Sequence, residues 1–230
     1  MRFNHNLLGG IIMLGTFFGL VSGTRSAHAE TPLLPKPAID LPAPGPDEKT
    51  RTAIFAGGCF WCTEAVFEEL AGVSDVTSGY AGDSKESAKY DVVCTGLTRH
   101  AEAIKITYDP SKIAFGDLLQ VFFALHDPTT LNRQGADVGT QYRSAIFYQN
   151  DDEKRVAEAY IKQLDEAKLF PKAIVTTLEP IGAGFFDAEE YHQNFVCRNP
   201  NQGYVRAVAL EKLRKVREKF PNEVKPAEKK

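Results

Sequence analysis

The sequence has no excess of charge of either sign. Its 27 lysines and arginines stand against 30 aspartates and glutamates, which gives a formal net charge of −3 at pH 7. No basic stripe stands out before the short tail that follows Pro221. Because a basic patch is the usual signature of a protein that binds nucleic acid, we expect no nucleic-acid partner.

An apolar run long enough to span a membrane is also missing. The run from Leu7 to Val21 is shorter than the roughly 18 residues of a spanning helix. Arg2 precedes it, and small and polar residues ending in Ala27-His28-Ala29 follow. This pattern predicts that residues 1–29 are a cleaved secretory signal peptide, and that the protein is periplasmic or secreted. The alternative is that this segment is not cleaved and anchors the protein in the membrane. If it is cleaved, we expect the protein to contact the membrane only through the signal peptide, before cleavage.

Cysteine is scarce, and its spacing argues against the common metal and phosphate sites. The cysteines are Cys59, Cys62, Cys94 and Cys197, and only the first two are closely spaced. A structural zinc site needs a second close pair, so no metal is expected. A cysteine phosphatase needs an arginine six positions after its cysteine, and in CTGLTR the arginine follows Cys94 by one position fewer. The pattern YDVVC predicts that Cys94 is a buried, inert thiol on a strand, and Cys197 is predicted in a loop or helix end.

Composition divides the rest of the chain into three parts. Residues 30–49 hold six prolines and are predicted to be an extended linker without a packed core. Residues 50–221 have the apolar and aromatic content of one domain. Residues 222–230 are predicted to be a charged tail. We expect a monomer.

Strand and helix patterns alternate within residues 50–221. A strand is predicted at 51–56, and apolar residues at helical spacing follow from Cys59. Further strands are predicted at 73–82, 100–110, 144–149 and 173–180, and further helices at 115–125, 151–168 and 209–219. This interleaving, with no internal repeat, predicts an α/β or α+β fold with helices packed on one mixed sheet.

One predicted strand carries an acid on its apolar face. In HAEAIKITYDP, residues 100–110, Glu102 alternates onto the same face as Ile104, Ile106 and Tyr108. Burial there would remove water from the carboxylate, which raises its pKa and keeps it protonated near neutral pH.

The stretch GGCFWC places Cys59 in the first turn of a predicted helix. The helix dipole and free N–H groups favour a thiolate there by about 0.3–2 kcal/mol, while Glu64 in the same turn opposes it. Phe60 and Trp61 would form an apolar pocket for a small group such as a methyl, and aromatic faces also favour sulfur. A structural Cys59–Cys62 disulfide in a binding module, and a general thiol–disulfide oxidoreductase, remain the alternatives.

Six blocks follow one another between Thr52 and Tyr204. They are GGCFWC with TEAVFEEL, SGYAG, KYDVVCTG, HAEAIKITYDP, HDPTTLNRQGADVGTQYRSAIFY and YHQNFVCRNPNQGY. Together they resemble the methionine sulfoxide reductase A family. The resemblance implies a two-layer α+β sandwich with a ferredoxin-like core, helices packed on a mixed β-sheet, and no bound cofactor.

The resemblance also implies an activity, which is reduction of the S-epimer of methionine sulfoxide, free or in peptides and oxidised proteins. Cys59 is then the nucleophile, and Phe60 and Trp61 line the methyl pocket. The residues that bind the sulfoxide oxygen or shape the pocket are Tyr90, Glu102, Asp137 and Tyr142. Neither spacing nor the resemblance assigns chemistry to His100, His126 or His192.

The expected reaction leaves Cys59 as a sulfenic acid, which a second thiol must convert to a disulfide. Many members of the family hold resolving cysteines in a glycine-rich C-terminal tail that this chain lacks. Cys62, one helical turn along, is therefore the predicted resolving cysteine, and Cys197 is the second candidate. A thioredoxin-like protein or a dithiol is expected to reduce the disulfide.

Overall fold

The computed structural model describes residues 34–226, so the predicted signal peptide lies outside the described residues. A six-stranded sheet has the order β7-β6-β1-β3-β2-β8. Its strands are β1 (Arg51–Gly57), β2 (Val73–Ala81), β3 (Ala101–Tyr108), β6 (Ser144–Tyr148), β7 (Thr177–Pro180) and β8 (Phe185–Asp187). Neighbouring strands are antiparallel except for the parallel pair β6 and β7, so the sheet is mixed as predicted.

The central part of this sheet is a ferredoxin-like unit. Chain order β1-α1-β2-β3-α3-β6 combines with the spatial order β6-β1-β3-β2, which is the arrangement expected from the resemblance. A short ribbon of β4 (Arg133–Gln134) and β5 (Asp137–Val138) stands apart from the sheet. The helices are α1 (Phe60–Glu68), α2 (Tyr90–Val93), α3 (Phe115–Leu125), α4 (Asp151–Glu166), α5 (Phe195–Arg198) and α6 (Leu210–Lys219).

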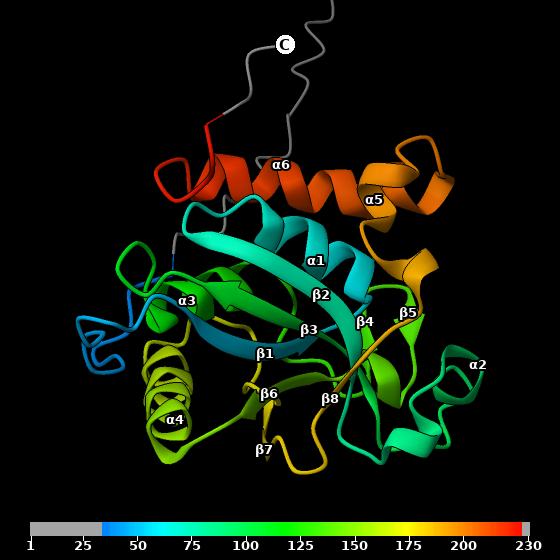
Figure 1. The fold of residues 1–230 in the computed structure, drawn as a ribbon, viewed down its shortest axis with the longest axis horizontal. Coiled ribbons are helices and arrows are strands. Elements are labelled where there is room, and N and C mark those ends of the chain that lie inside the picture. Colours follow the sequence, from blue (N-terminus) through cyan, green and yellow to red (C-terminus); the bar gives the residue numbers. More distant parts are fainter. Residues whose placement is uncertain (1–33, 227–230) are drawn as a thin grey trace, which may run out of the picture. The chain divides into compact units, whose positions relative to one another are not determined.

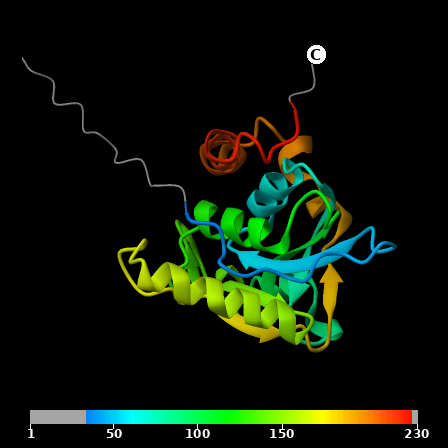
Figure 2. The same cartoon turned by 90° about the vertical axis from the view of Figure 1, so that its left-hand side faces the viewer.

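Strand alternation divides the sheet into two faces. Phe55, Ile104 and Ile106 point into the large core, where α1, α3 and α4 pack on the sheet. Ile54 and Ala103 point to the other face, into a smaller cluster. Figure 2 shows α3 and α4 side by side against the sheet. The helices therefore form one layer and the sheet the other, as predicted.

The C-terminal helix, α6, packs on α1 and α3 of the helix layer. Figure 1 shows α6 running above α1, and the two helices are in contact. A π-helical segment, Val205–Ala209, leads directly into α6. Among residues 34–226, no helix has both the length and the apolar content to cross a membrane.

The proline-rich segment is not a free spacer over the part that the structure describes. Leu34 is 3% exposed and belongs to the large core, and the side chain of Gln120 donates to its carbonyl. The Tyr160 hydroxyl donates to Pro35 O over 2.8 Å, and Gly116 N donates to Asp40 over 3.0 Å. The prolines keep the segment extended, but side chains of α3 and α4 hold it against the domain.

The predicted charged tail is likewise attached at its start. Val224 pairs with Leu70 in an antiparallel bridge, and Ala71 N donates to Glu223 O over 2.6 Å. Residues 227–230 lie outside the described residues. The domain boundary expected at residue 221 is therefore too early, because the backbone of the next residues is hydrogen-bonded to the end of α1.

Candidate active site

The turn between β1 and α1 places Cys59 at the start of the helix. Gly58 has a φ of +93°, and a Cβ there would lie 2.6 Å from the Gln134 side chain, so the turn requires glycine. Cys59 is the N-cap of α1, and its carbonyl accepts from Cys62 N over 3.1 Å. The backbone thus fixes both cysteines on the first turn.

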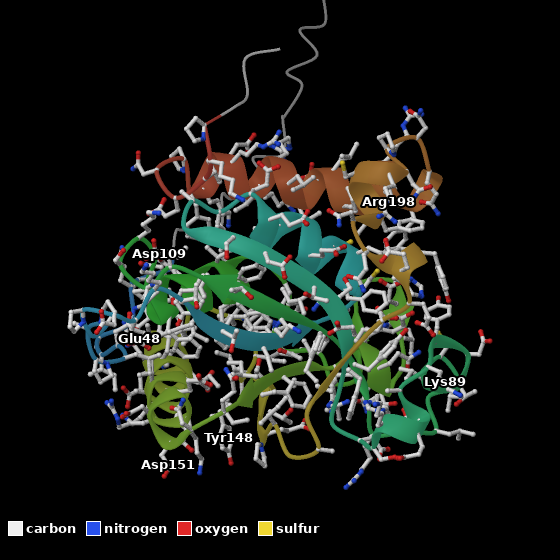
Figure 3. The ribbon with its side chains drawn as sticks, in the orientation of Figure 1. Glu48, Lys89, Asp109, Tyr148, Asp151 and Arg198 are labelled. Carbon is white, nitrogen blue, oxygen red and sulfur yellow. The ribbon has the colours of Figure 1, made fainter. Side chains whose placement is uncertain are left out.

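A cavity of about 230 Å³ opens at this helix start. Tyr90, the first residue of α2, lines it. Figure 3 labels Lys89, directly before α2, on the side opposite Glu48 and Asp109. The cavity lining includes all the residues predicted for the nucleophile, the oxygen site and the methyl pocket, which are Cys59, Phe60, Trp61, Tyr90, Glu102, Asp137 and Tyr142. Gln202 and Tyr204 complete it, and neither was predicted from the sequence.

Glu102 reaches the cavity from β3 and is 2% exposed. Its Oε2 accepts a hydrogen bond of 3.1 Å from Phe60 N, the first amide of α1. Burial raises the pKa of Glu102 to about 8, although the Phe60 amide opposes the shift. The carboxyl group therefore holds a proton at neutral pH, as predicted from strand alternation.

Two phenols lie with this acid in the cavity. Tyr90 begins α2, and its amide is held by Glu189 over 2.9 Å. Tyr142 ends a short 3-10 helix, Thr140–Tyr142. Burial raises the pKa of both tyrosines well above the ordinary value, so both remain hydrogen-bond donors at neutral pH.

The indole of Trp61 is held on two sides. Phe195 of α5 stacks on it with ring centroids 3.7 Å apart and planes 8° apart. Trp61 Nε1 donates to His192 Nδ1 over 3.0 Å. The His192 ring also packs on Phe60, at 5.0 Å between centroids. These contacts give the cavity a rigid apolar wall, which suits an S-methyl group.

His192 is a structural part of the site that the sequence analysis left out. Its side chain is 1% exposed, and burial lowers its pKa, so the ring is neutral and Nδ1 can accept from Trp61. The other ring nitrogen, Nε2, lies 4.0 Å from Glu189. The only signal in the sequence was its place in the block YHQNFVCRNPNQGY, which also contains Phe195 and Tyr204.

The acid that was expected to oppose a thiolate is occupied elsewhere. Glu64 of α1 accepts a hydrogen bond of 3.0 Å from Asn194 N, at the start of α5. Burial raises the pKa of Glu64 to about 7, which reduces its negative charge. Glu64 therefore ties α5, and with it the stacked Phe195, to the helix that carries the cysteines.

The two thiols of α1 are buried and share a hydrogen bond. Cys59 is 8% exposed and Cys62 1% exposed, and no disulfide joins them. The hydrogen bond to Cys62, together with burial, raises the pKa of Cys59. The same hydrogen bond lowers the pKa of Cys62 to about 7. This hydrogen bond favours ionisation of Cys62 over Cys59, whereas the helix position alone had favoured a thiolate at Cys59.

Tyr204 connects this pair to the β4–β5 ribbon. Its hydroxyl donates to Asp137 Oδ2 over 2.7 Å and lies 3.8 Å from Cys62 Sγ. Burial raises the pKa of Tyr204 well above the ordinary value, so the phenol keeps its proton. Asp137 thus contributes to the site partly by fixing Tyr204.

Neither of the remaining cysteines lines the cavity, although Cys94 shares a hydrogen bond with Tyr90, which does. The predicted strand around Cys94 is wrong: Tyr90–Val93 is a short helix, and Cys94 is half-buried at its end. The amide of Tyr90 finds its acceptor in Glu189, which favours a helical turn over a strand. Cys197 is exposed on α5, as predicted for a helix end. Residues 34–226 contain no cluster of side chains suited to a metal ion.

Comparison with known proteins identifies the family. The profile of peptide methionine sulfoxide reductase matches residues 51–224. The chain belongs to the peptide methionine sulfoxide reductase family. It is therefore an oxidoreductase that reduces methionine sulfoxide in peptides, a reaction that repairs oxidised proteins.

Similar proteins cover nearly the whole domain. Peptide methionine sulfoxide reductase MsrA 2 of Mesorhizobium japonicum is 52% identical over 180 residues, which are 78% of this chain and 90% of that protein. The MsrA of Natronomonas pharaonis is 52% identical over 175 residues, 76% of this chain and 98% of that protein. The crystal structure of reduced Mxr1 from Saccharomyces cerevisiae has a TM-score of 0.62 and 36% identity, covering 68% of this chain and 89% of that chain. Methionine sulfoxide reductase A of Corynebacterium diphtheriae follows with a TM-score of 0.59, 34% identity, and coverage of 68% and 78%.

Proposed function

We propose that the chain reduces the S-epimer of methionine sulfoxide with Cys59 as the nucleophile. The observation that supports this most strongly is one cavity, which brings the Cys59 thiol together with the protonated Glu102 and the aromatic wall of Trp61. The test is reduction of methionine R- and S-sulfoxides separately, with free methionine measured by chromatography. Product from the S-epimer alone is expected, and equal use of both epimers would contradict the proposal.

The first chemical step uses the buried acid. Cys59 sulfur attacks the sulfoxide sulfur while Glu102 gives its proton to the sulfoxide oxygen, because that oxygen must be neutralised before the S–O bond can break. Tyr90 and Tyr142 donate to the same oxygen as charge develops on it. The hydroxyl group then passes from the methionine sulfur to Cys59 sulfur as the S–S bond made by the attack breaks. Methionine leaves with both electrons of that S–S bond, and Cys59 is oxidised to a sulfenic acid.

Cys62 then resolves the sulfenic acid. Its sulfur attacks Cys59 sulfur, water leaves, and a Cys59–Cys62 disulfide forms. The shared first helical turn and the hydrogen bond between the thiols support this choice over the exposed Cys197. Mass spectrometry of the chain after one turnover distinguishes the two, because a Cys59–Cys197 crosslink with Cys62 free would contradict it.

The disulfide is returned to two thiols by an external dithiol. A thioredoxin-like protein is the proposed physiological donor, because its reactive dithiol can exchange with the Cys59–Cys62 disulfide. Turnover with thioredoxin, or with dithiothreitol in its place, is the expected result. Formation of one methionine per chain, with no further product in either reductant, would contradict this part of the proposal.

The setting of the reaction is also a proposal. The apolar run of residues 7–21 and the following Ala27-His28-Ala29 support export, so the clients would be oxidised proteins and peptides of the periplasm or exterior. We propose that the chain acts there as a monomer. Cell fractionation and the N-terminal sequence of the purified protein test export, and scattering in solution tests the monomer.

A general thiol–disulfide oxidoreductase is the competing function of a CxxC pair. The burial of both thiols, at 8% and 1% exposed, argues against direct attack on folded disulfide proteins. Reduction of insulin faster than reduction of methionine sulfoxide would favour that alternative.

A further inference from the structure

Cys62 is placed to act before it resolves the sulfenic acid. Its amide donates to Cys59 O over 3.1 Å, so both thiols lie on one helical turn and in one buried cluster, where a hydrogen bond from the Cys59 thiol lowers the pKa of Cys62. Cys62 is the more deeply buried of the two, at 1% exposed. A resolving thiol needs only to reach Cys59 after the first step. A negative charge on Cys62 beside the reduced Cys59 is therefore not needed for the resolving role. A buried charge of this kind persists only where other groups stabilise it.

Helix α6 supplies a stabilising cation. Lys212 and Cys62 line the same narrow void between α1, α3 and α6. After the Cys59 hydrogen bond, the positive charge of Lys212 is the main influence that lowers the pKa of Cys62. A thiolate at Cys62 is thus supported from two sides, by a donor from its own helix and by an ammonium group from α6.

The protonated form of Cys62 is accommodated as well. Its thiol can donate to Tyr204 Oη, which lies 3.8 Å away. The Tyr204 proton is directed to Asp137 over 2.7 Å, which leaves the oxygen lone pairs free to accept. Cys62 therefore has a partner in each of its two protonation states, and this is the arrangement that a group exchanging a proton requires.

We propose that Cys62 is the internal base of the reduction step, taking the S–H proton of Cys59 as Cys59 attacks the sulfoxide. Cys62 later gives this proton to the hydroxyl group that leaves when the disulfide closes. The inference rests on the proposed role of Cys59 as nucleophile. It assigns Cys62 two successive tasks, first as proton acceptor and then as resolving thiol.

Protons and electrons balance over the two steps. In the first step, the Cys59 proton moves to Cys62, the Glu102 proton moves to the sulfoxide oxygen, and that oxygen ends as Cys59–S–OH. Methionine sulfur is reduced by two electrons and Cys59 sulfur is oxidised by two. In the second step the S–S bond forms, the S–OH bond breaks, and the Cys62 proton joins the hydroxyl as water. Glu102 is left ionised and regains a proton from solvent.

The surrounding charges set the pH at which the pair works. Cys59 and Lys212 lower the pKa of Cys62, while Asp137 raises it. Glu102 is the acid on the Cys59 side. His126, which lines the same void, stays neutral because burial lowers its pKa to about 4. One proton should therefore leave the thiol pair near pH 7 while Glu102 is still protonated.

The first test counts thiolates directly. In the full chain carrying Cys94→Ser and Cys197→Ser, thiolate absorbance is followed against pH. The pair is expected to lose its first proton near pH 7, and adding Cys62→Ser should move this deprotonation up by at least about one pH unit. An unchanged titration after Cys62→Ser would overturn the inference.

The second test separates the base from the resolving thiol. Rapid mixing with methionine S-sulfoxide, without reductant, measures methionine released in the first turnover, which needs no resolving thiol. Cys62→Ser should release one methionine per chain, at least about tenfold more slowly at pH 7 and with its optimum at higher pH. A first-turnover rate and pH profile equal to those of the wild type would overturn the inference and leave Cys62 as a resolving thiol only.

A matched pair of variants on α6 tests the cation. Lys212→Met should raise the pH of the first deprotonation and slow the first turnover at pH 7 by about two- to threefold. Lys215→Met removes an exposed lysine of the same helix, whose partner is Glu211 at 3.6 Å, and should change neither quantity. Equal shifts in both variants would contradict a specific role for Lys212.

Failure of the proposed function gives a different result. If Cys59→Ser still released methionine in the first turnover, the nucleophile would be wrong and both proposals would fall. If Cys59→Ser is inactive and Cys62→Ser behaves as the wild type, only the role of Cys62 as base is lost.

Discussion

Two hollows in this molecule are each lined by a buried glutamate that accepts a hydrogen bond near the start of a helix, and only the smaller hollow has the chemistry of a site. The larger hollow, of about 470 Å³, is lined by Glu153 at the start of α4. Glu153 is 5% exposed, and both of its carboxylate oxygens accept hydrogen bonds, from Gln149 and Asn150. Among residues 34–226, Phe60 N alone donates a hydrogen bond to Glu102, which is 2% exposed.

The different hydrogen bonding of these two glutamates shows that the volume of a hollow does not identify the active site. Glu153 completes a helix cap together with Asn150, whose side chain accepts from Glu153 N over 2.9 Å, so its charge is fully used in holding α4. Glu102 retains one oxygen that can carry a proton into a cavity with a thiol and two phenols. A buried acid with spare hydrogen-bonding capacity is costly to the fold, and here that capacity serves the reaction.

The largest effect is expected from the thiols. Cys59→Ser should abolish methionine formation, because the hydroxyl group is too weak a nucleophile for the sulfoxide. Cys94→Ser and Cys197→Ser, outside the cavity lining, should keep more than half of the wild-type rate. Chromatographic measurement of free methionine with dithiothreitol as reductant checks all three. Loss of activity in Cys197→Ser alone would move the reaction away from the smaller hollow.

The two glutamates give the sharpest contrast. Glu102→Gln should lower the rate of the first turnover by about 10²- to 10⁴-fold, because the amide cannot protonate the oxygen. Glu153→Gln should leave that rate unchanged but lower the free energy of unfolding by about 1–3 kcal/mol, since an amide donor would face the Gln149 and Asn150 donors. Rapid-mixing kinetics and denaturant unfolding measure the two effects. A slow first turnover in Glu153→Gln together with a normal rate in Glu102→Gln would contradict the assigned roles.

The pH dependence of the first turnover is expected to be bell-shaped. The rate should rise as the thiol pair loses a proton near pH 7, the pKa of Cys62 being about 7. It should fall as Glu102 loses its proton, since its pKa is about 8. About one unit beyond either limit, the rate should drop about tenfold. A profile in which Glu102→Gln retains the alkaline fall would show that another group is the acid.

A smaller effect is expected from the phenols. Tyr142→Phe removes one of two donors to the developing oxygen charge and should lower the rate of the first turnover by about tenfold. Tyr108→Phe is the matched control, because the Tyr108 hydroxyl is buried and has no hydrogen-bond partner in the described structure. Its removal should change neither the rate nor the melting temperature appreciably. Equal rates for Tyr142→Phe and the wild type would exclude Tyr142 as a donor.

The smallest effect on activity is expected at the attached N-terminal segment. Leu34→Ala should lower the free energy of unfolding by about 2–5 kcal/mol, because the side chain fills part of the large core. The rate at a temperature well below unfolding should not change. Denaturant unfolding measures this, and an unchanged stability would restore the interpretation of residues 30–49 as a free linker.

Much of the site followed from local patterns in the sequence. Strand alternation placed Glu102 on the same face as Ile104, and the stretch GGCFWC placed Cys59 at the start of a helix; both are observed. These features depend on neighbours within a few residues, and local spacing therefore predicts them.

Features that depend on distant partners were missed. The helix at Tyr90 is held by Glu189, 99 residues later, and Leu34 is held by Gln120, 86 residues later. His192 joins the site through rings on other elements, and no spacing rule connects it to Trp61. Composition predicted an extended linker without a packed core and a charged tail, because it contains no information about such contacts.

The most direct test of the account is to trap the oxidised nucleophile. The full chain with Cys62→Ser and Cys197→Ser is given methionine S-sulfoxide and then dimedone, which reacts with sulfenic acids, and its peptides are weighed by mass spectrometry. One adduct on the peptide containing Cys59 for each methionine released is the expected result. Methionine released without an adduct at Cys59, or with the adduct at Cys94, would contradict the claim that Cys59 attacks the sulfoxide.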